Sequence, residues 1–260
     1  MSQTKESTPA PTLQSMDRGM RILELLAERP MRAKDLADAL GSKWATTHRT
    51  LTYLRGSGYV RRDEDSGLHY VGRRMFSIGA AYLGNHALLN NALPAMRALA
   101  DEMGGFVQIA ERDGAFSTAI ASVEPRTPAD SITASSMLGR RYPLHTGARS
   151  QVLLAYADAE VVEEYLASPL EPLTMFSITD PQELRERLER TRRNGYAVTA
   201  QDVTVWSASV AAPIRDRNGE VVASAAAISY HEGGEHSAAA VRGIVDLARS
   251  LSHALGWRLD

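Results

Sequence analysis

Residues 32–62 form the stretch that most restricts how this chain can fold. Apolar side chains and a closing glycine lie there at helical spacing, at Ala33, Leu36, Ala37, Leu40 and Gly41. The i, i+3, i+4, i+7 spacing predicts a short amphipathic helix, and glycine commonly follows the end of one. A second helix is predicted from about 43 to 55, where glycines end it, and a basic strand follows from 59 to 62. This order predicts a winged helix-turn-helix.

The flanking segments complete that pattern. Ser15 is the expected N-cap of a first helix that runs to about Glu28, and Pro30 ends it. After the basic strand, residues 63–67 predict a turn and residues 68–71 a return strand, so the two strands form the wing. We therefore expect a DNA-binding domain over residues 14–73, preceded by a disordered tail over residues 1–13.

The predicted helix from 43 to 55 has two chemically different sides. At 100° per residue, Trp44, Leu51 and Leu54 share one side, which we expect to pack on the two preceding helices. The opposite side has long donors, hydroxyls and a phenol but no carboxylate, which suits the phosphates and base edges of a major groove. An ordinary solvated helix face is the alternative. The predicted DNA-contact residues are Lys43, Thr46, Arg49, Thr50 and Tyr53 on this side, Thr47 at its boundary, and Arg61 and Arg62 on the wing as phosphate contacts.

Charge is distributed unevenly along the chain, whose formal net charge is -2. Residues 14–75 hold 12 Lys+Arg and 8 Asp+Glu, a net of +4. Residues 76–260 hold 16 Lys+Arg and 22 Asp+Glu, a net of -6. A basic part joined to an acidic part indicates that only the first meets a polyanion.

Composition excludes several other classes of protein. The sequence has no cysteine, which rules out disulfides, thiolate catalysis and cysteine zinc sites and suits a reducing cytoplasm. The N-terminus has no apolar h-region, so we expect no signal peptide, and no apolar run is long enough to span a bilayer. We expect a cytoplasmic protein with no membrane partner.

Residues 74–91 are predicted to form a linker helix. Apolar side chains occur on more than one of its faces, with Phe76 and Leu83 on one and Ile78 and Tyr82 on another. Such a helix can contact a second subunit or pack only within its own chain. Helix-turn-helix proteins usually bind DNA as dimers, because one recognition helix reads too few base pairs. We therefore expect a subunit contact here.

Residues 92–260 alternate between strand and helix signals. Asp113-Gly114 and Asn218-Gly219 are typical of hairpin turns, and Asp180-Pro181 is typical of a helix start. Strands are predicted at 106–112, 115–123, 131–138, 196–202, 205–214 and 220–230, with helices at 147–157, 159–166, 181–194 and 236–257. Strands grouped around hairpins, with helices between them, predict an α+β domain with an antiparallel sheet.

Catalytic and metal-binding patterns are weak in this second domain. It contains no G-x-S-x-G, Walker or G-x-G-x-x-G motif, and all three lysines of the chain precede it. His231 to His236 resembles a metal cluster, but its two central glycines indicate a flexible loop. His145 before a helix is more typical of a structural histidine than of a catalytic base. We therefore predict no enzyme activity, no catalytic residues, no cofactor and no metal.

A ligand site is better supported at the junction of residues 145–148. Backbone N–H groups at the start of a helix favour an anion such as a carboxylate, and Gly147 allows close approach. The alternative is an ordinary turn that opens a helix.

Several segments together resemble the IclR-type transcriptional regulators. They are GMRILELLAE, LADAL, the T-T-H-R-T-L run from Thr46 to Leu51, GYVRRD, GRRMFSIGAAYL, GRRYPLHTGA, RRNGYAV, VAAPIRDRNGEVVA and the final helix. They cover about residues 14–258, and their order and spacing make the match specific. The resemblance implies a GAF-like effector-binding and oligomerisation domain over residues 92–260. It places the effector pocket, by position, at Gly147, Ala148, Thr199, Ser207, Ser209, Ala226 and Ile228.

The chain departs from the family pattern around that pocket. Ala148-Arg149-Ser150-Gln151 stands where the family commonly has A-L-G-K, and Trp206 follows Gln201-Asp202, so we add Arg149 and Trp206 to the effector-binding candidates. Members that bind small keto acids use serines where this chain has Ala226 and Ile228. An apolar wall beside an anion site predicts an effector with a carboxylate and an apolar or aromatic body.

The sequence thus predicts a ligand-responsive transcriptional regulator. It would bind palindromic operator DNA as a homodimer or homotetramer and respond to a small organic acid. The alternative is a metabolite sensor or enzyme that keeps a degenerate helix-turn-helix only for dimerisation.

Overall fold

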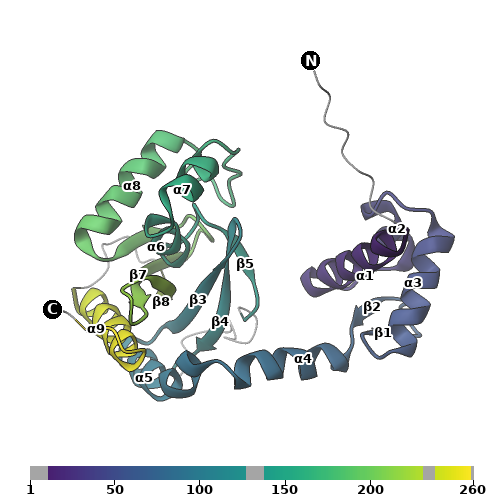
Figure 1. Ribbon diagram of the computed structural model, residues 1–260, viewed down its shortest axis with the longest axis horizontal. Coiled ribbons are helices and arrows are strands. Elements are labelled where there is room, and N and C mark those ends of the chain that lie inside the picture. The colour runs from purple at the N-terminus through teal and green to yellow at the C-terminus, as the bar shows by residue number, and fades with distance from the viewer. Residues whose placement is uncertain (1–10, 127–137, 231–237, 259–260) are drawn as a thin grey trace. The chain divides into compact units, whose positions relative to one another are not determined.

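The computed structural model describes residues 11–126, 138–230 and 238–258 (Figure 1). The chain divides into two compact units, Met1–Asn85 and His86–Asp260. The first is a winged helix-turn-helix and the second is built on an antiparallel sheet, so the predicted α+β class is confirmed.

The first unit contains three helices, a two-stranded wing and a fourth helix. These are α1 (Pro11–Glu28), α2 (Ala33–Ala39), α3 (Trp44–Gly56), β1 (Val60–Arg62), β2 (His69–Val71) and α4 (Arg73–Gly84). Ile22, Leu36 and Leu51 form the centre of its core and are almost completely buried. The apolar residues predicted from helical spacing in α1 and α2 therefore supply one side of the core on which α3 packs.

Two helix starts differ from the sequence predictions. Helix α1 begins at Pro11, not after Ser15, and proline is well suited to a first helical position. Helix α3 has Lys43 at its N-cap, with no side-chain cap. The hydroxyl of the preceding residue, Ser42, contacts the hydroxyl of Thr47.

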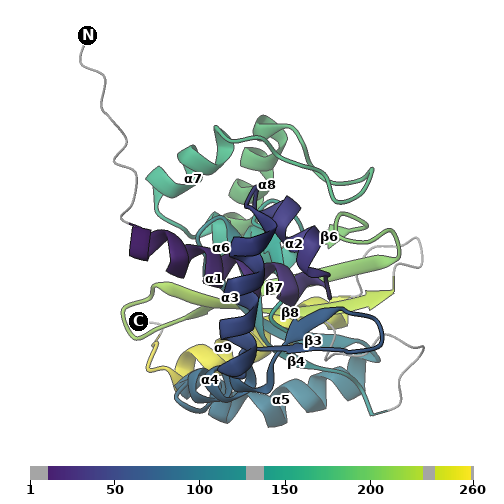
Figure 2. The same ribbon diagram turned by 90° about the vertical axis from the view of Figure 1, so that its right-hand side faces the viewer.

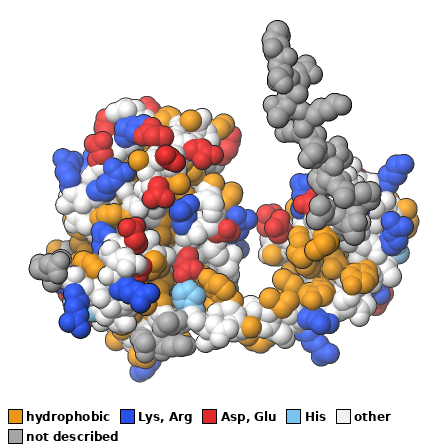
Figure 3. Space-filling view, in the orientation of Figure 1, with side chains coloured by type: hydrophobic (Ala, Val, Ile, Leu, Met, Phe, Trp, Pro, Cys, Tyr) orange, Lys and Arg blue, Asp and Glu red, His pale blue; other side chains and the backbone are white. Residues whose placement is uncertain are grey.

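The predicted linker helix is interrupted. Helix α4 ends at Gly84, with Asn85 as its C-cap, and α5 (Ala87–Met103) begins after His86. His86 has extended backbone angles, so the i to i−4 hydrogen bonds cannot continue through it. No residue of α4 is buried, and Phe76 and Ile78 are 79% and 52% exposed. The space-filling view shows hydrophobic side chains at the surface of the first unit (Figure 3).

The second unit is a six-stranded antiparallel sheet with helices on both faces. Besides α5, its elements are β3 (Phe106–Asp113), β4 (Phe116–Val123), β5 (Arg141–Pro143), α6 (Ala148–Ala155), α7 (Ala159–Leu166), α8 (Pro181–Asn194), β6 (Ala197–Ala200), β7 (Ser207–Arg215), β8 (Val221–Tyr230) and α9 (Ala238–Ala254). The strand order is β5-β4-β3-β8-β7-β6. Helices α5 and α9 pack together on one face, while α6 covers the other (Figures 1 and 2).

Burial along the central strand agrees with this layering. Six consecutive residues of β8, from 223 to 228, are buried, which requires cover on both faces of the sheet. Most of them are alanines, and small side chains allow a helix to approach the sheet closely. Ala148 and Val152 of α6 pack there against Ala211 and Ala226. The sheet thus positions the first turn of α6.

Two strand predictions need correction or fall outside the structure. The predicted strand 131–138 lies almost entirely outside the described residues, and β5 was not predicted. Strand β7 begins at Ser207, not at Val205, because residues 201–206 form a loop. Within the described part of the chain, no helix is long and apolar enough to cross a membrane.

Candidate functional site

The outer face of α3 presents the predicted side chains to solvent. Lys43 and Arg49 are exposed, and Tyr53 is 73% exposed. Thr46 and Thr50 are half-buried, and the Thr50 hydroxyl donates to the Thr46 carbonyl oxygen at 3.1 Å. This bond to the backbone fixes the Thr50 hydroxyl as a donor and leaves both lone pairs of its oxygen available as acceptors.

Two residues of α3 lie where we did not expect them. Thr47, predicted at the boundary of the DNA-contact face, is 0% exposed, and its hydroxyl contacts Ser42. It therefore joins the helix to the preceding turn and is not available to DNA. Trp44, predicted to pack inward, is 56% exposed, and its ring stacks on His48 with centroids 4.9 Å apart. Trp44 and His48 thus extend the exposed face of the helix.

The two predicted wing arginines are held differently. The Arg61 guanidinium lies 4.0 Å from the centroid of the Tyr70 ring, on the residue paired with it across the wing. The Arg62 Nη1 atom lies 3.0 Å from Glu64 Oε2. One cation therefore rests on an aromatic face, and the other is partly neutralised by a carboxylate of the wing tip.

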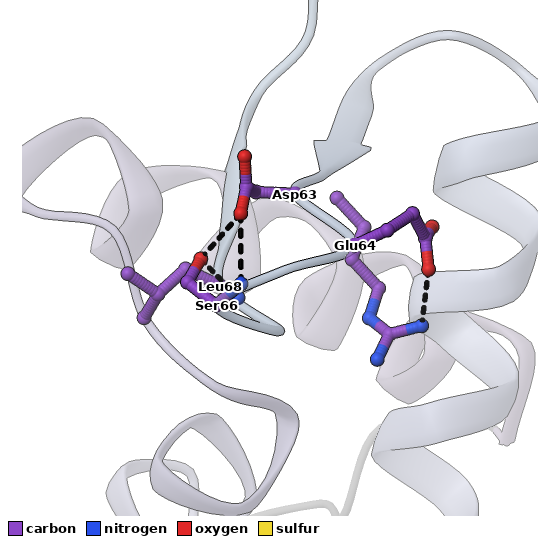
Figure 4. A network of polar contacts seen from close by, with 5 residues as sticks. Asp63, Glu64, Ser66 and Leu68 are labelled. Atoms are coloured by element: carbon purple, nitrogen blue, oxygen red, sulfur yellow. Dashed lines mark hydrogen bonds and ion pairs between the residues drawn. The ribbon is translucent and has the colours of Figure 1, made fainter.

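The turn of the wing is ordered by Asp63 (Figure 4). Its Oδ1 accepts hydrogen bonds from the Ser66 N–H at 2.9 Å and from the Ser66 hydroxyl at 2.7 Å. The bond from the Ser66 N–H is the main reason that the pKa of Asp63 lies below its ordinary value. The Ser66 hydroxyl oxygen accepts in turn from the Leu68 N–H at 3.3 Å. These bonds fix the turn that joins β2 to β1, the strand that carries both arginines.

A cavity of about 180 Å³ lies in the second unit, between the start of α6, the 201–206 loop and the sheet. Eight of the nine predicted effector-binding residues line it: Gly147, Ala148, Arg149, Trp206, Ser207, Ser209, Ala226 and Ile228. Thr199 is not in the lining, but its hydroxyl lies 2.9 Å from the hydroxyl of Ser209. The lining residues that sequence reasoning missed are Arg140, Tyr142, Thr146, Val203 and Thr204.

The helix start at this cavity does not offer free donors as predicted. Gly147 has a φ of +78°, which favours glycine, and its N–H donates to Asp202 Oδ2 at 2.9 Å. The Ala148 N–H donates to the Ser209 hydroxyl at 3.2 Å. The expectation that these two N–H groups await an anion is therefore wrong, because the chain supplies their acceptors. Burial raises the pKa of Asp202 above its ordinary value, although the Gly147 N–H opposes that rise.

Two hydroxyls hold the 201–206 loop from outside. The Thr174 hydroxyl donates to the Gln201 carbonyl oxygen at 2.6 Å, and the Ser177 hydroxyl donates to that of Asp202 at 2.8 Å. Gln201 has a φ of +64°, a left-handed conformation that is costly for a residue with a side chain. The conformation persists because the carbonyl oxygens of Gln201 and Asp202 and the Asp202 carboxylate all accept hydrogen bonds.

A buried cation forms part of the cavity wall. Arg149, in the first turn of α6, is 5% exposed, and its Nη1 donates to Gln108 Oε1. Its guanidinium lies 4.7 Å from the centroid of the Tyr142 ring, and its Nη2 is buried without a hydrogen-bond partner among the described residues. Burial lowers the pKa of Arg149 to about 10, so the side chain remains protonated at neutral pH.

His145 makes structural hydrogen bonds. Its Nδ1 lies 2.8 Å from the Tyr165 hydroxyl, and its Nε2 lies 3.1 Å from the Glu171 carbonyl oxygen. Burial lowers the pKa of His145. The described residues contain no cluster of acidic or histidine side chains able to hold a metal ion, and His231 to His236 lie outside them.

Comparisons of sequence give one consistent result. A family model described as the IclR helix-turn-helix domain matches residues 15–64, and one described as bacterial transcriptional regulator IclR C-terminal matches residues 80–253. The chain is 31% identical over 214 residues to the HTH-type transcriptional repressor AllR of Escherichia coli K12, covering 81% of this chain and 78% of that protein. It is also 31% identical over 255 residues to the glycerol operon regulatory protein of Streptomyces coelicolor, covering 95% and 98%.

Solved structures share the same fold. An IclR transcriptional regulator from Alicyclobacillus acidocaldarius aligns with a TM-score of 0.81 at 23% identity, over 96% of this chain and all of that one. An IclR homologue from Microbacterium hydrocarbonoxydans, solved in complex with 4-hydroxybenzoate, aligns with a TM-score of 0.77 at 24% identity, over 93% and 98%.

Proposed function

This chain belongs to the IclR family of bacterial transcriptional regulators, and from that premise we propose that it is a ligand-responsive regulator that binds a palindromic operator. The family consists of regulators that are not enzymes. In this proposal the first unit binds DNA and the second unit binds a small organic acid. Its place of action is the cytoplasm, where the operator lies.

One observation supports the DNA-binding role above the others. The exposed face of α3 presents Lys43, Arg49 and Tyr53 and has no carboxylate, while Leu51 and Leu54 of the same helix are buried. A helix fixed on one side and cationic on the other can enter a major groove and meet both phosphates and base edges. Arg61 and Arg62 of the wing would contact the flanking backbone.

We propose that the regulator binds as a dimer or a tetramer. One recognition helix reads too few base pairs, so a palindrome requires two. The exposed apolar side chains of α4, Phe76 and Ile78, support a subunit contact along that helix, because solvent contact of such groups is unfavourable.

The cavity of the second unit supports a small organic acid as effector. It combines a buried cation, Arg149, with an apolar wall that includes Ala226 and Ile228. An IclR homologue with this fold was solved in complex with 4-hydroxybenzoate, which supports an aromatic acid as a candidate effector. Binding would shift the population between arrangements of two subunits whose recognition helices do or do not match the operator.

A gel shift with the DNA upstream of the chain's own coding sequence tests the DNA-binding role. We expect specific binding whose affinity falls steeply with salt, by a logarithmic slope of roughly 0.9 per phosphate contact. A scrambled duplex of equal length and composition is the control. Equal binding to both duplexes would contradict operator recognition, and binding to neither would favour a sensor that keeps the helix-turn-helix for dimerisation.

A further inference from the structure

We propose that Arg149 is the residue that receives the effector's carboxylate and that Gln108 positions it, so that the cavity selects monocarboxylic acids with one ring-sized apolar body. This inference rests on the proposed acid-binding role of the second unit and goes beyond it. It assigns the anion site to one side chain instead of to the start of α6.

Arg149 is a buried cation that has no carboxylate partner among the described residues. Among the described residues, no acidic side chain forms an ion pair with Arg149. Its neighbours are the neutral amide of Gln108 and the ring of Tyr142, and its Nη2 makes no hydrogen bond to any described residue. An arginine removed from water without a counter-charge is costly, and a carboxylate offers it two parallel hydrogen bonds.

The alternative anion site at this cavity is already occupied by the chain. The Asp202 carboxylate accepts from the Gly147 N–H, and the Ser209 hydroxyl accepts from the Ala148 N–H. A ligand carboxylate placed there would meet another carboxylate, which is unfavourable in a buried site. The other cation in the lining is Arg140, which is exposed and well solvated. Arg149 is therefore the favoured partner for a buried acid group.

Gln108 fixes the orientation of Arg149. It is 0% exposed in the middle of β3, and its Nε2 donates to the Ser122 hydroxyl of the neighbouring strand at 3.2 Å. That bond turns the amide oxygen toward the guanidinium, where it accepts from Nη1. With Nη1 engaged, the rest of the guanidinium is held against Tyr142 and cannot change rotamer freely.

Size and lining define the body of the ligand. A cavity of roughly 150 Å³ can hold benzene, so about 180 Å³ accommodates one ring with a carboxylate. Tyr142 and Trp206 offer aromatic surface, and Val203, Ala226 and Ile228 offer aliphatic surface. A two-carbon or three-carbon acid would leave most of that apolar wall uncovered, so we expect it to bind more weakly.

Calorimetric titration of the full chain with benzoate, benzamide and pyruvate tests this assignment. We expect benzoate to bind more tightly than the uncharged benzamide and than pyruvate. The variant Arg149→Met keeps length and apolar volume, and we expect it to weaken benzoate about 30-fold or more, as when one partner of a buried charge pair is removed. Its affinity for benzamide should change by less than about threefold, which also shows that the cavity is intact. Arg193→Gln, at an exposed arginine of α8 that does not line the cavity, is the matched control and should leave benzoate affinity within about threefold.

A second variant, Gln108→Glu, tests the same role of Arg149 without replacing Arg149 itself. Gln108→Glu supplies Arg149 with a carboxylate from the chain itself. We expect an unchanged or higher melting temperature, retained binding of benzamide, and benzoate binding at least about tenfold weaker, because the guanidinium already has its partner.

The outcomes separate this inference from the proposed function. If wild-type protein binds benzoate and both variants bind it equally well, the role of Arg149 is wrong while the acid-binding role stands. If wild-type protein binds none of the acids at millimolar concentration, the acid-binding role itself is wrong. If Arg149→Met does not fold, Gln108→Glu decides the question alone.

Discussion

The Gly147 N–H donates to Asp202 Oδ2 across 2.9 Å, joining two residues that are 55 positions apart in sequence. Helix α6 therefore begins against a carboxylate of its own chain, a favourable arrangement for the positive end of a helix dipole. The same bond anchors the 201–206 loop, three residues of which line the cavity. The Asp202 side chain thus both holds the loop that forms a cavity wall and places a negative charge at the start of α6.

Replacing Asp202 by asparagine should change how stability depends on pH. Burial raises the pKa of Asp202 in the folded state above its ordinary value of 3.8, so the folded state holds this proton more tightly than the unfolded state. The contribution of Asp202 to the free energy of unfolding is then most favourable at low pH and is lost as the pH rises through the raised pKa. Asparagine keeps an acceptor for the Gly147 N–H but does not titrate.

Urea unfolding of both proteins over a series of pH values above about 4 measures this difference. The stability of wild type relative to Asp202→Asn should fall with rising pH, by at most about 1.4 kcal/mol per pH unit. A difference that stays constant over the whole series would contradict a raised pKa.

Arg49→Ala should weaken operator binding without affecting the ligand cavity. Loss of one base or phosphate contact costs about 1–3 kcal/mol, so we expect roughly 10-fold weaker binding in a gel shift. Thr46→Ala should act in the same direction. Effector affinity should remain nearly unchanged, because neither residue belongs to the second unit. Arg193→Ala removes an exposed arginine from the second unit and serves as the charge-matched control. Unchanged operator affinity in both α3 variants would refute the proposed recognition face.

Glu64→Gln should strengthen DNA binding. Glu64 holds Arg62 at 3.0 Å and places a negative charge on the wing, where a phosphate would approach. Its neutral variant frees Arg62 and removes a repulsion, so we expect affinity to rise by roughly two- to fivefold and the salt slope to steepen by up to about 1. Fluorescence anisotropy with labelled operator at several salt concentrations measures both quantities. Weaker binding would indicate that the ion pair orders Arg62 for DNA contact.

Phe76→Ser should reduce self-association while leaving the fold intact. No residue of α4 is buried in one chain, so the free energy of unfolding of a monomer should change by no more than about 0.5 kcal/mol. If α4 contacts a second subunit, the variant should sediment as a smaller species at concentrations where wild type is dimeric. Leu173→Ser is the matched control, because Leu173 is also an exposed apolar residue but lies in the second unit. An unchanged sedimentation profile for Phe76→Ser would place the subunit contact elsewhere.

Local pattern was sufficient to predict most elements of the fold. Periodicities of 3.6 and 2 residues, together with Asp113-Gly114 and Asn218-Gly219, predicted most of the helices and the two central hairpins. The errors concern side chains whose face of the helix was predicted correctly but whose burial was not. A helical wheel places Trp44 and Leu51 on one side of α3 but does not show how far the neighbouring core extends, and Trp44 lies beyond it.

The site was predictable only in part, for a related reason. The glycine at 147 and the helix after it marked one wall of the cavity, and the resemblance to a family supplied the strand positions. The acceptor for the Gly147 N–H comes from Asp202, and no local pattern reveals a partner so distant in sequence. The same holds for Tyr142, since β5 has three residues and is defined only by its pairing with β4.

If Arg61 contacts a phosphate as we propose, its contact with Tyr70 lowers the entropic cost of DNA binding. A long side chain that is free in the unbound protein loses conformational entropy when it is fixed on a phosphate, by roughly 0.5–1.5 kcal/mol per side chain. The Arg61 guanidinium already lies 4.0 Å above an aromatic ring across the wing. Much of that ordering therefore takes place when the chain folds, and the wing would meet a phosphate with this cation already restrained.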